Sequence, residues 1–433
     1  MRLTLRRGSE IQKQRGAAAL IMLTILILGA ATLLVSQLNQ LSSRFDNHRQ
    51  SDQSLQAAKE SLLGWALSYT QRPGLMPVPD LRNDNNYDGE SDCPFGAINA
   101  NHLLGRLPWR AYLDAPPNAY CSSSRGGVGA QLTDSAAEPL WYAVSANLLY
   151  SNAYPSIHPD TVNLGAGWIT VRDAQGNVVS NRVAAVVIAP GAMLPGQNRA
   201  VAAPTAANYL DSVTIGAANF SNADLDLDFI AGDESDTFND RLIYITIDEL
   251  MAQVERKVGA TASACLDAYA AASGNKYSWA APLNGAAPPS YTGLVNNSFG
   301  RIPSAPNIEA SPGVNDGTMQ SSWQPANCFS SLSYWLDWRE FVFYQVAAGY
   351  APGSTATCPV CLTFSGAGNY RAMVIVGGAA LLGQARVTNA DKGNIANYLE
   401  GDNADGDNDF ENQPGSAVFN DRAVCLDGGT LCR

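Results

Sequence analysis

The longest apolar pattern in the chain is a run without a charged residue over residues 17–35, AAALIMLTILILGAATLLV. A helix of this length spans roughly the 30 Å of a bilayer hydrocarbon core. Five basic residues precede the run, and basic residues favour the cytoplasmic side of a membrane. The pattern therefore predicts a transmembrane helix, with residues 1–16 inside the cell and the rest of the chain exported.

The apolar pattern continues beyond this run at helical spacing. No proline occurs between Ala17 and Arg72, and apolar side chains recur every three or four residues, which predicts that one helix face is buried. They are Leu55, Ala58, Leu62, Trp65 and Ala66. Pro73 and Gly74 are typical of a helix end. We therefore predict one long helix over 17–72, half in the membrane and half packed on a globular body.

Further along, short apolar runs separated by turn residues predict β-hairpins. Runs 168–172 and 178–188 flank the turn-rich segment 173–177, and runs 360–364 and 370–376 flank 365–369. Segment 248–272 instead keeps an apolar helix face without a membrane-length run. The fold class predicted from these patterns is α+β, with antiparallel sheets.

The body of the chain repeats itself in five collinear blocks, which indicates a tandem duplication. The paired blocks are 105–108 with 300–303, 142–146 with 344–348, 182–199 with 371–386, 208–211 with 397–400, and 238–241 with 419–422. The predicted domains are therefore a basic leader (1–16), a transmembrane and stalk helix (17–72), a first head (73–247) and a second head (248–433).

The charge of the chain excludes one class of partner. Acidic residues outnumber basic ones 39 to 27, and five of the basic ones lie in the first sixteen positions. A nucleic-acid-binding protein needs a basic surface to displace counterions from phosphates. We therefore expect no nucleic-acid partner, and a divalent cation suits the acidic body better.

Eight cysteines form an even set, and an exported body favours disulfides. Proximity in sequence suggests the pairs Cys93–Cys121, Cys265–Cys328, Cys358–Cys361 and Cys425–Cys432. The Cys-Pro-Val-Cys spacing of the third pair also occurs in redox sites, but there the first cysteine begins a helix, whereas this pair enters a strand-like run. A structural disulfide is the favoured interpretation.

Two acidic loops are candidates for binding calcium. Asp84, Asn86 and Asp88 precede a glycine, as in the first half of a calcium-binding loop, and Asp92 replaces the missing twelfth-position glutamate as a possible ligand. A second loop offers Asp402, Asp405, Asp407 and Asp409 at similar spacing. The alternative for both is a solvated Asn/Asp turn.

The residues around Gly16 and Ala17, QRGAAALI, resemble the prepilin processing site of the type IV pilin superfamily. The resemblance implies that a prepilin peptidase cleaves after Gly16 and methylates Ala17. It also implies that the two tandem heads are pilin-like. The resemblance further implies a single-pass protein of the bacterial inner membrane, with its body in the periplasm or on an extracellular filament, and other pilin or pseudopilin subunits as partners.

One position departs from the family pattern. Most members carry glutamate at the fifth mature position, where this chain has Ile21. K-type pseudopilins and some minor pilins also lack this glutamate and are thought to sit at the filament tip. K-type pseudopilins are also known to bind calcium. The resemblance therefore implies a minor pilin or pseudopilin that initiates or caps a type IV pilus or a type II secretion pseudopilus.

Two other functions stay open. An adhesin-like protein on the same scaffold would use the second head to grip a surface. A membrane-tethered envelope enzyme is the third reading, but the chain has no nucleophile elbow, phosphate-binding loop or dinucleotide fingerprint. We therefore expect no enzyme.

Overall fold

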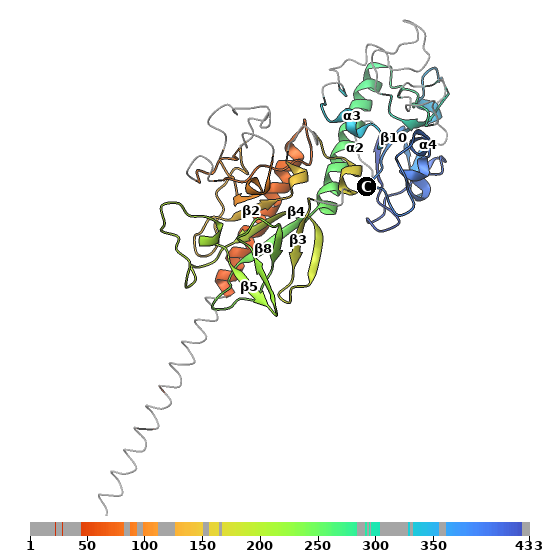
Figure 1. The fold of residues 1–433 in the computed structure, drawn as a ribbon. Coiled ribbons are helices and arrows are strands. Elements are labelled where there is room, and N and C mark those ends of the chain that lie inside the picture. Colours follow the sequence, from red (N-terminus) through yellow and green to blue (C-terminus); the bar gives the residue numbers. More distant parts are fainter. Residues whose placement is uncertain are drawn as a thin grey trace, which may run out of the picture.

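The computed structural model describes residues 22, 28, 45–81, 87–92, 98–110, 126–149, 156–163, 167–283, 291, 294, 296–303, 328–329, 332–354 and 361–426. Two units lie side by side, with a long helix between them (Figure 1). We call these units the first head and the second head. Gly16 and Ala17 lie outside the described residues.

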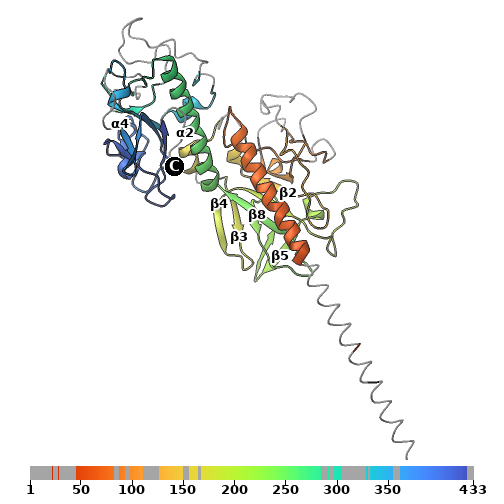
Figure 2. The ribbon, with the colours of Figure 1, turned by 180° about the vertical axis from the view of Figure 1, so that it is seen from behind.

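The N-terminal helix, described over 45–68, lies across the first head (Figure 2). Its apolar stripe is buried, as the spacing predicts: Leu55, Ala58, Leu62 and Ala66 are at most 3% exposed. The helix ends four residues before the predicted end at Arg72. The Gly74 N–H caps it by donating to the Ala66 carbonyl (3.1 Å). Gly74 has a φ of +95°, and a Cβ there would lie 2.4 Å from Ile157.

The prediction of a transmembrane helix is not supported, and with it the prediction of a single-pass inner-membrane protein is withdrawn. Among the described residues, no helix is both long enough and apolar enough to cross a membrane. Helix α2 (Ile247–Ala272) has the length, but its polar face carries charged residues such as Asp248, Glu249 and Lys257. Segment 17–35 itself, apart from Met22 and Leu28, lies outside the described residues.

A six-stranded sheet forms the first head, in the order β1-β2-β4-β3-β7, with β8 also paired to β4. Its strands are β1 (Leu104–Arg106), β2 (Trp141–Val144), β3 (Ile169–Arg172), β4 (Val178–Ala189), β7 (Asp228–Ile230) and β8 (Arg241–Thr246). A separate hairpin joins β5 (Ser212–Ile215) to β6 (Ala218–Ser221). The predicted hairpin over 168–188 is therefore present as β3 and β4.

The second head contains a four-stranded sheet, in the order β15-β13-β10-β9, and a three-stranded sheet, β12-β11-β14. Its elements are β9 (Phe299–Arg301), α3 (Trp335–Trp338), β10 (Val342–Val346), β11 (Leu362–Phe364), β12 (Ala367–Tyr370), β13 (Ala372–Val376), α4 (Asn389–Gly393), β14 (Asp409–Phe410) and β15 (Arg422–Leu426). Strands β9, β10, β13 and β15 repeat the neighbour order of β1, β2, β4 and β8.

The prediction of purely antiparallel sheets was wrong. Strand β3 pairs with β7 in parallel, and β11 pairs with β14 in parallel. Parallel neighbours need a long crossover connection, and in both heads the chain makes other strands and loops before it returns to form the parallel pair. The local pattern of β7 and β14, at two or three residues each, was too short to predict their pairing.

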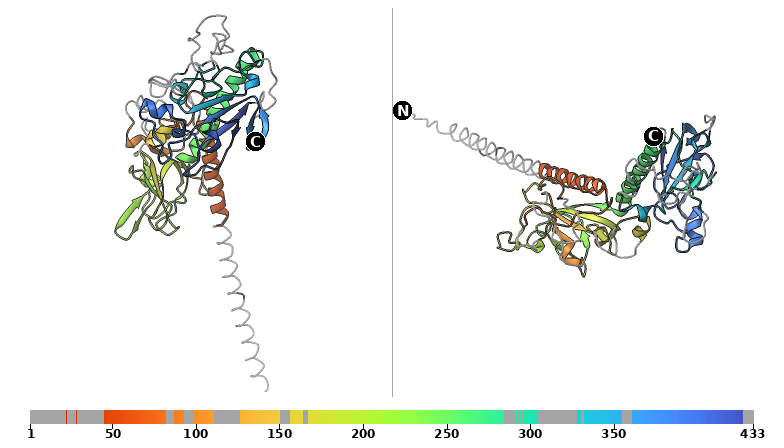
Figure 3. Two further views of the ribbon diagram at one scale, coloured as in Figure 1. Left: turned by 90° about the vertical axis from the view of Figure 1, so that its right-hand side faces the viewer. Right: turned by 90° about the horizontal axis from the view of Figure 1, so that it is seen from above.

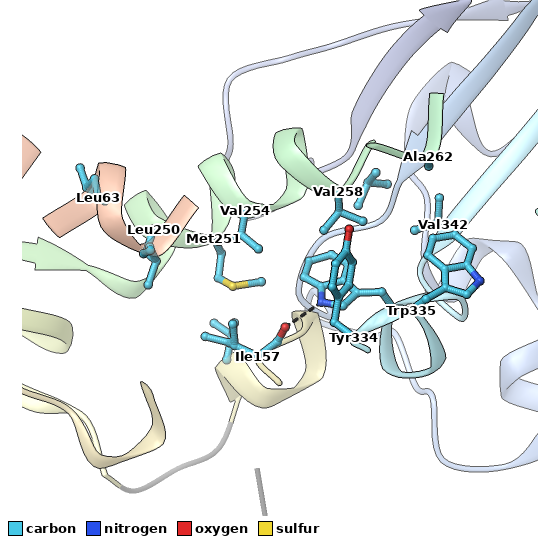
Figure 4. Close-up of a cluster of buried hydrophobic side chains, with 14 of the residues drawn as sticks. Leu63, Ile157, Leu250, Met251, Val254, Val258, Ala262, Tyr334, Trp335 and Val342 are labelled. Carbon is cyan, nitrogen blue, oxygen red and sulfur yellow. Dashed lines mark hydrogen bonds between the residues drawn. The ribbon is translucent and has the colours of Figure 1, made fainter. Parts of the chain in front are cut away.

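One apolar core runs through both heads. Figure 4 shows one side of α2, from Leu250 to Ala262, facing both Ile157 of the first head and Tyr334 and Trp335 of the second. The buried Trp338 indole donates a hydrogen bond across this interface to the Ile157 carbonyl (2.8 Å). Because the interface is continuous core, the two heads form one packed unit. The aromatic residues near Trp338 are thus core residues.

Candidate functional site

A polar network joins the loop after β4 to the segment that precedes β5. The Gln197 side chain donates to the Tyr209 carbonyl (2.9 Å) and to Asp211 Oδ1 (2.8 Å). Arg199 donates to the Gly191 carbonyl (2.9 Å) and to Gln197 Oε1 (2.9 Å). These side chains satisfy main-chain groups that two adjacent loops would otherwise bury unpaired.

The second head builds the same network after β13. The Gln384 side chain donates to Glu400 Oε1 (2.7 Å). Arg386 donates to the carbonyls of Asn397 (2.6 Å) and Gly378 (3.0 Å). The sequence comparison had already aligned these residues as blocks, and the structure now gives their common role, which is to hold two loops together.

Each network includes an aromatic ring between two arginines. The Tyr209 ring lies 5.1 Å from the Arg106 guanidinium and 5.0 Å from that of Arg199. In the second head the matching residues are Tyr398, Arg301 and Arg386, at 5.2 and 4.5 Å. Such cation–π contacts gain strength when they are shielded from water. Arg301 is fully buried, whereas the equivalent Arg106 is partly buried.

A pair of carboxyl groups closes the network of the first head. Asp240 Oδ2 accepts hydrogen bonds from the Asp211 N–H (2.8 Å) and the Asn222 side chain (3.0 Å). Asp211 Oδ2 accepts in return from the Asp240 N–H (3.1 Å). Burial raises the pKa of Asp240 well above its usual value, and the neighbouring Asp211 charge raises it further. Both causes favour the protonated form of Asp240.

Glu400 and Asp421 form the equivalent pair in the second head. Asp421 Oδ2 accepts from the Glu400 N–H (2.6 Å) and the Asn403 side chain (3.4 Å). Glu400 Oε2 accepts from the Asn420 N–H (3.0 Å). Burial and the Glu400 charge raise the pKa of Asp421 well above its usual value. Both pairs fasten the turn that leads into the last strand of each head.

The equivalent arginines Arg199 and Arg386 form ion pairs with different kinds of partner. Arg199 forms an ion pair with Glu138 of its own head (3.0 Å). Arg386 instead pairs with Asp160 of the first head (3.0 Å), although its side chain is only 3% exposed. One copy of a duplicated arginine therefore stabilises a single head, and the other links the two heads.

The predicted calcium loop at 402–409 is part of a sixth repeat that the sequence comparison missed. Residues 222–229 and 403–410 share the pattern N-A-D-x-D-x-D-F. Asp405 accepts a hydrogen bond from the Asp407 N–H (3.0 Å), and Asp407 accepts from the Asp409 N–H (2.7 Å), so the spacing suits an Asx turn. The signal for it is the shared pattern itself, which lies between the fourth and fifth pairs of blocks in both heads.

Calcium binding stays a prediction for both acidic loops. The described residues contain no group of three or more His, Cys, Asp or Glu side chains arranged to hold a metal. Asp84 and Asn86 lie outside the described residues. Asp88 accepts from the Glu90 N–H (2.8 Å), and Asp92 accepts from the Leu81 N–H. The like charge of Glu411 raises the pKa of the exposed Asp402.

Among the expected disulfides, Cys265–Cys328 is formed, with its Cα atoms 5.7 Å apart. It ties α2 to the segment before α3. Cys361 and Cys425 are also disulfide-bonded. The other cysteines, Cys93, Cys121, Cys358 and Cys432, lie outside the described residues.

Comparison of the chain with protein-family models, with curated proteins and with solved structures finds no match.

Proposed function

We propose that this chain is a minor, pilin-like structural subunit that initiates or caps a type IV pilus or a type II secretion pseudopilus. Two features support this proposal. The sequence around Gly16 and Ala17 resembles a prepilin processing site. The N-terminal helix presents one face to a sheet of the first head and leaves Phe45 72% exposed near its described start, so its first turns are available to neighbouring subunits.

The position of the second head supports a location of this subunit at the end of a filament. The second head lies beyond the C-terminal end of the N-terminal helix (Figure 3). Ser333 Oγ of this head donates to the carbonyl of Gln71 (2.6 Å), just after that helix. If N-terminal helices pack along a filament axis, the second head occupies the space into which the next subunit would stack. Because continuous core fixes this head, it cannot swing aside.

The first prediction concerns this location. A cysteine introduced at Val387, which is 87% exposed in the second head, and labelled with maleimide-gold should mark filament ends under the electron microscope. A control label at Met193, which is 59% exposed in the first head, should mark the same ends. Regular decoration along the shaft would contradict the proposal.

The second prediction concerns processing. Replacing Gly16 with tryptophan should block access of the peptidase to the Gly16–Ala17 bond, so the recovered protein should keep residues 1–16. Intact-mass measurement of wild type and variant distinguishes the two forms. The matched control Gly8→Trp leaves the bond unaltered and should be processed normally. Maturation of the Gly16 variant at the normal rate would remove the main support for the pilin resemblance.

A further inference from the structure

Strand β8 leaves main-chain hydrogen-bonding groups at an outer edge of the first sheet. One side of β8 pairs with β4. On the other side, Lys59 Nζ donates to the Tyr244 carbonyl (3.1 Å). Alternate residues of an antiparallel strand point their main-chain groups to the same side. The N–H and C=O of Leu242 therefore face outward, like those of Tyr244.

In the second head, a side-chain amide pairs with the equivalent edge of β15. Leu242 corresponds to Ala423, because the FNDR block precedes both residues. The Ala423 N–H donates to Asn412 Oδ1 (2.7 Å), and Asn412 Nδ2 donates to the Ala423 carbonyl (3.0 Å). One side-chain amide thus makes both hydrogen bonds that a residue of a neighbouring strand would make.

The first head lacks this amide. The Ile230 N–H donates to Asn222, and the Glu411 N–H donates to the equivalent Asn403, which aligns Ile230 with Glu411. The next residue, equivalent to Asn412, is therefore the exposed Ala231. Within the part of the chain that the structure describes, no group pairs with the outward N–H and C=O of Leu242.

A groove of about 590 Å³ lies between this edge and the N-terminal helix. Its apolar lining is Phe45, Leu55, Leu242 and Ile243. On its polar rim, Asp52 pairs with Arg241 (2.7 Å) and His48 contacts Glu234 (2.6 Å), and Arg49 also lines the groove. Because the lining beside Leu242 is apolar, the groove favours an occupant with uncharged, apolar side chains.

We propose that the β8 edge binds an uncharged, extended segment of another polypeptide, which adds a strand beside Leu242. The peptide group of that segment takes the place that the Asn412 amide takes in the second head. Its alternate apolar side chains pack on Phe45 and Ile243 in the groove. Lys59 closes the edge at Tyr244, so the added strand extends from Leu242 toward Arg241. This inference does not depend on the filament proposal.

The test uses the full chain and a synthetic probe, the blocked peptide acetyl-Thr-Val-Thr-Val-Thr-amide. Site-resolved hydrogen exchange of the free protein should show the Leu242 amide exchanging at least tenfold faster than the Ala423 amide. The probe should slow exchange at Leu242, and its N-methylated counterpart, which cannot pair, should not. Lack of protection at Leu242 at millimolar probe would overturn the proposal.

Matched variants identify the contact. Ala231→Asn supplies the amide found in the second head and should slow exchange at Leu242 and weaken probe binding at least tenfold. Ala231→Leu has a similar shape without the amide and should bind the probe like wild type. Leu242→Pro, tolerated at an outward-facing edge position, should abolish binding with the fold intact. Wild-type affinity in the Leu242→Pro variant would also overturn the proposal.

Discussion

Replacing Arg386 with alanine is expected to lower the free energy of unfolding by about 3 kcal/mol, because it strands buried carbonyl groups that each cost about 1–3 kcal/mol. The arginine donates to the carbonyls of Asn397 and Gly378 and stacks 4.5 Å from the Tyr398 ring. It also makes the ion pair with Asp160 that links the heads. Urea unfolding with the disulfides intact measures the loss.

Asp160→Ala is the matched control, since it removes only the ion pair between the heads. The Asp160 side chain is 37% exposed, and Arg386 keeps its hydrogen bonds to two carbonyls in this variant, so the expected loss is smaller than that of the Arg386 variant. Arg199→Ala tests the duplicate network and should cost a similar amount to the Arg386 variant. Equal, small losses in the Arg386 and Asp160 variants would show that the loop contacts contribute little.

The repeats predicted more of the architecture than the local patterns did. Helix α2 was predicted over 248–272 and begins at Ile247, where the preceding Thr246 caps it by accepting from the Glu249 N–H (3.1 Å). Collinear blocks also predicted two heads with related strands. The parallel partners β7 and β14 were missed, because strands of two or three residues carry too little periodicity.

The sequence indicated which residues of the two polar networks are repeated, but not which residues they bind. Gln197 and Gln384 stood in aligned blocks, but nothing local indicated their partners, since the Asp211 and Asp240 carboxyl groups come from segments 29 positions apart. Hydrogen bonds between distant loops are set by the fold. The same limit applies to the ion pair between Arg386 and Asp160, which are 226 positions apart. The equivalent arginine of the first head, Arg199, does not form a matching contact between the heads.

Helix α2 carries a glutamate against the second head that should make stability depend on pH. Glu255 is 5% exposed, and its nearest cation, Arg422 on β15, is 3.9 Å away. Burial raises the pKa of Glu255 to about 8, against the opposing influence of Arg422, Arg256 and Arg386, while Asp248 adds to the rise. The folded protein therefore keeps this side chain protonated at neutral pH.

The sign of the effect follows from proton linkage. Between the unfolded pKa of 4.5 and the folded value of about 8, unfolding releases a proton, so the free energy of unfolding falls as pH rises. The contribution of Glu255 is at most about 1.4 kcal/mol per pH unit in that window, and it levels off above it.

Glu255→Gln imitates the protonated form and should remove this part of the slope. We therefore expect the variant to match wild type near pH 4.5 and to exceed it increasingly toward pH 8, in urea unfolding measured across the range. The difference between the two proteins isolates Glu255 from Asp240 and Asp421, whose raised pKa values contribute equally to both. Parallel profiles for wild type and variant would show that Glu255 is already ionised in the folded protein, with Arg422 as its counter-ion.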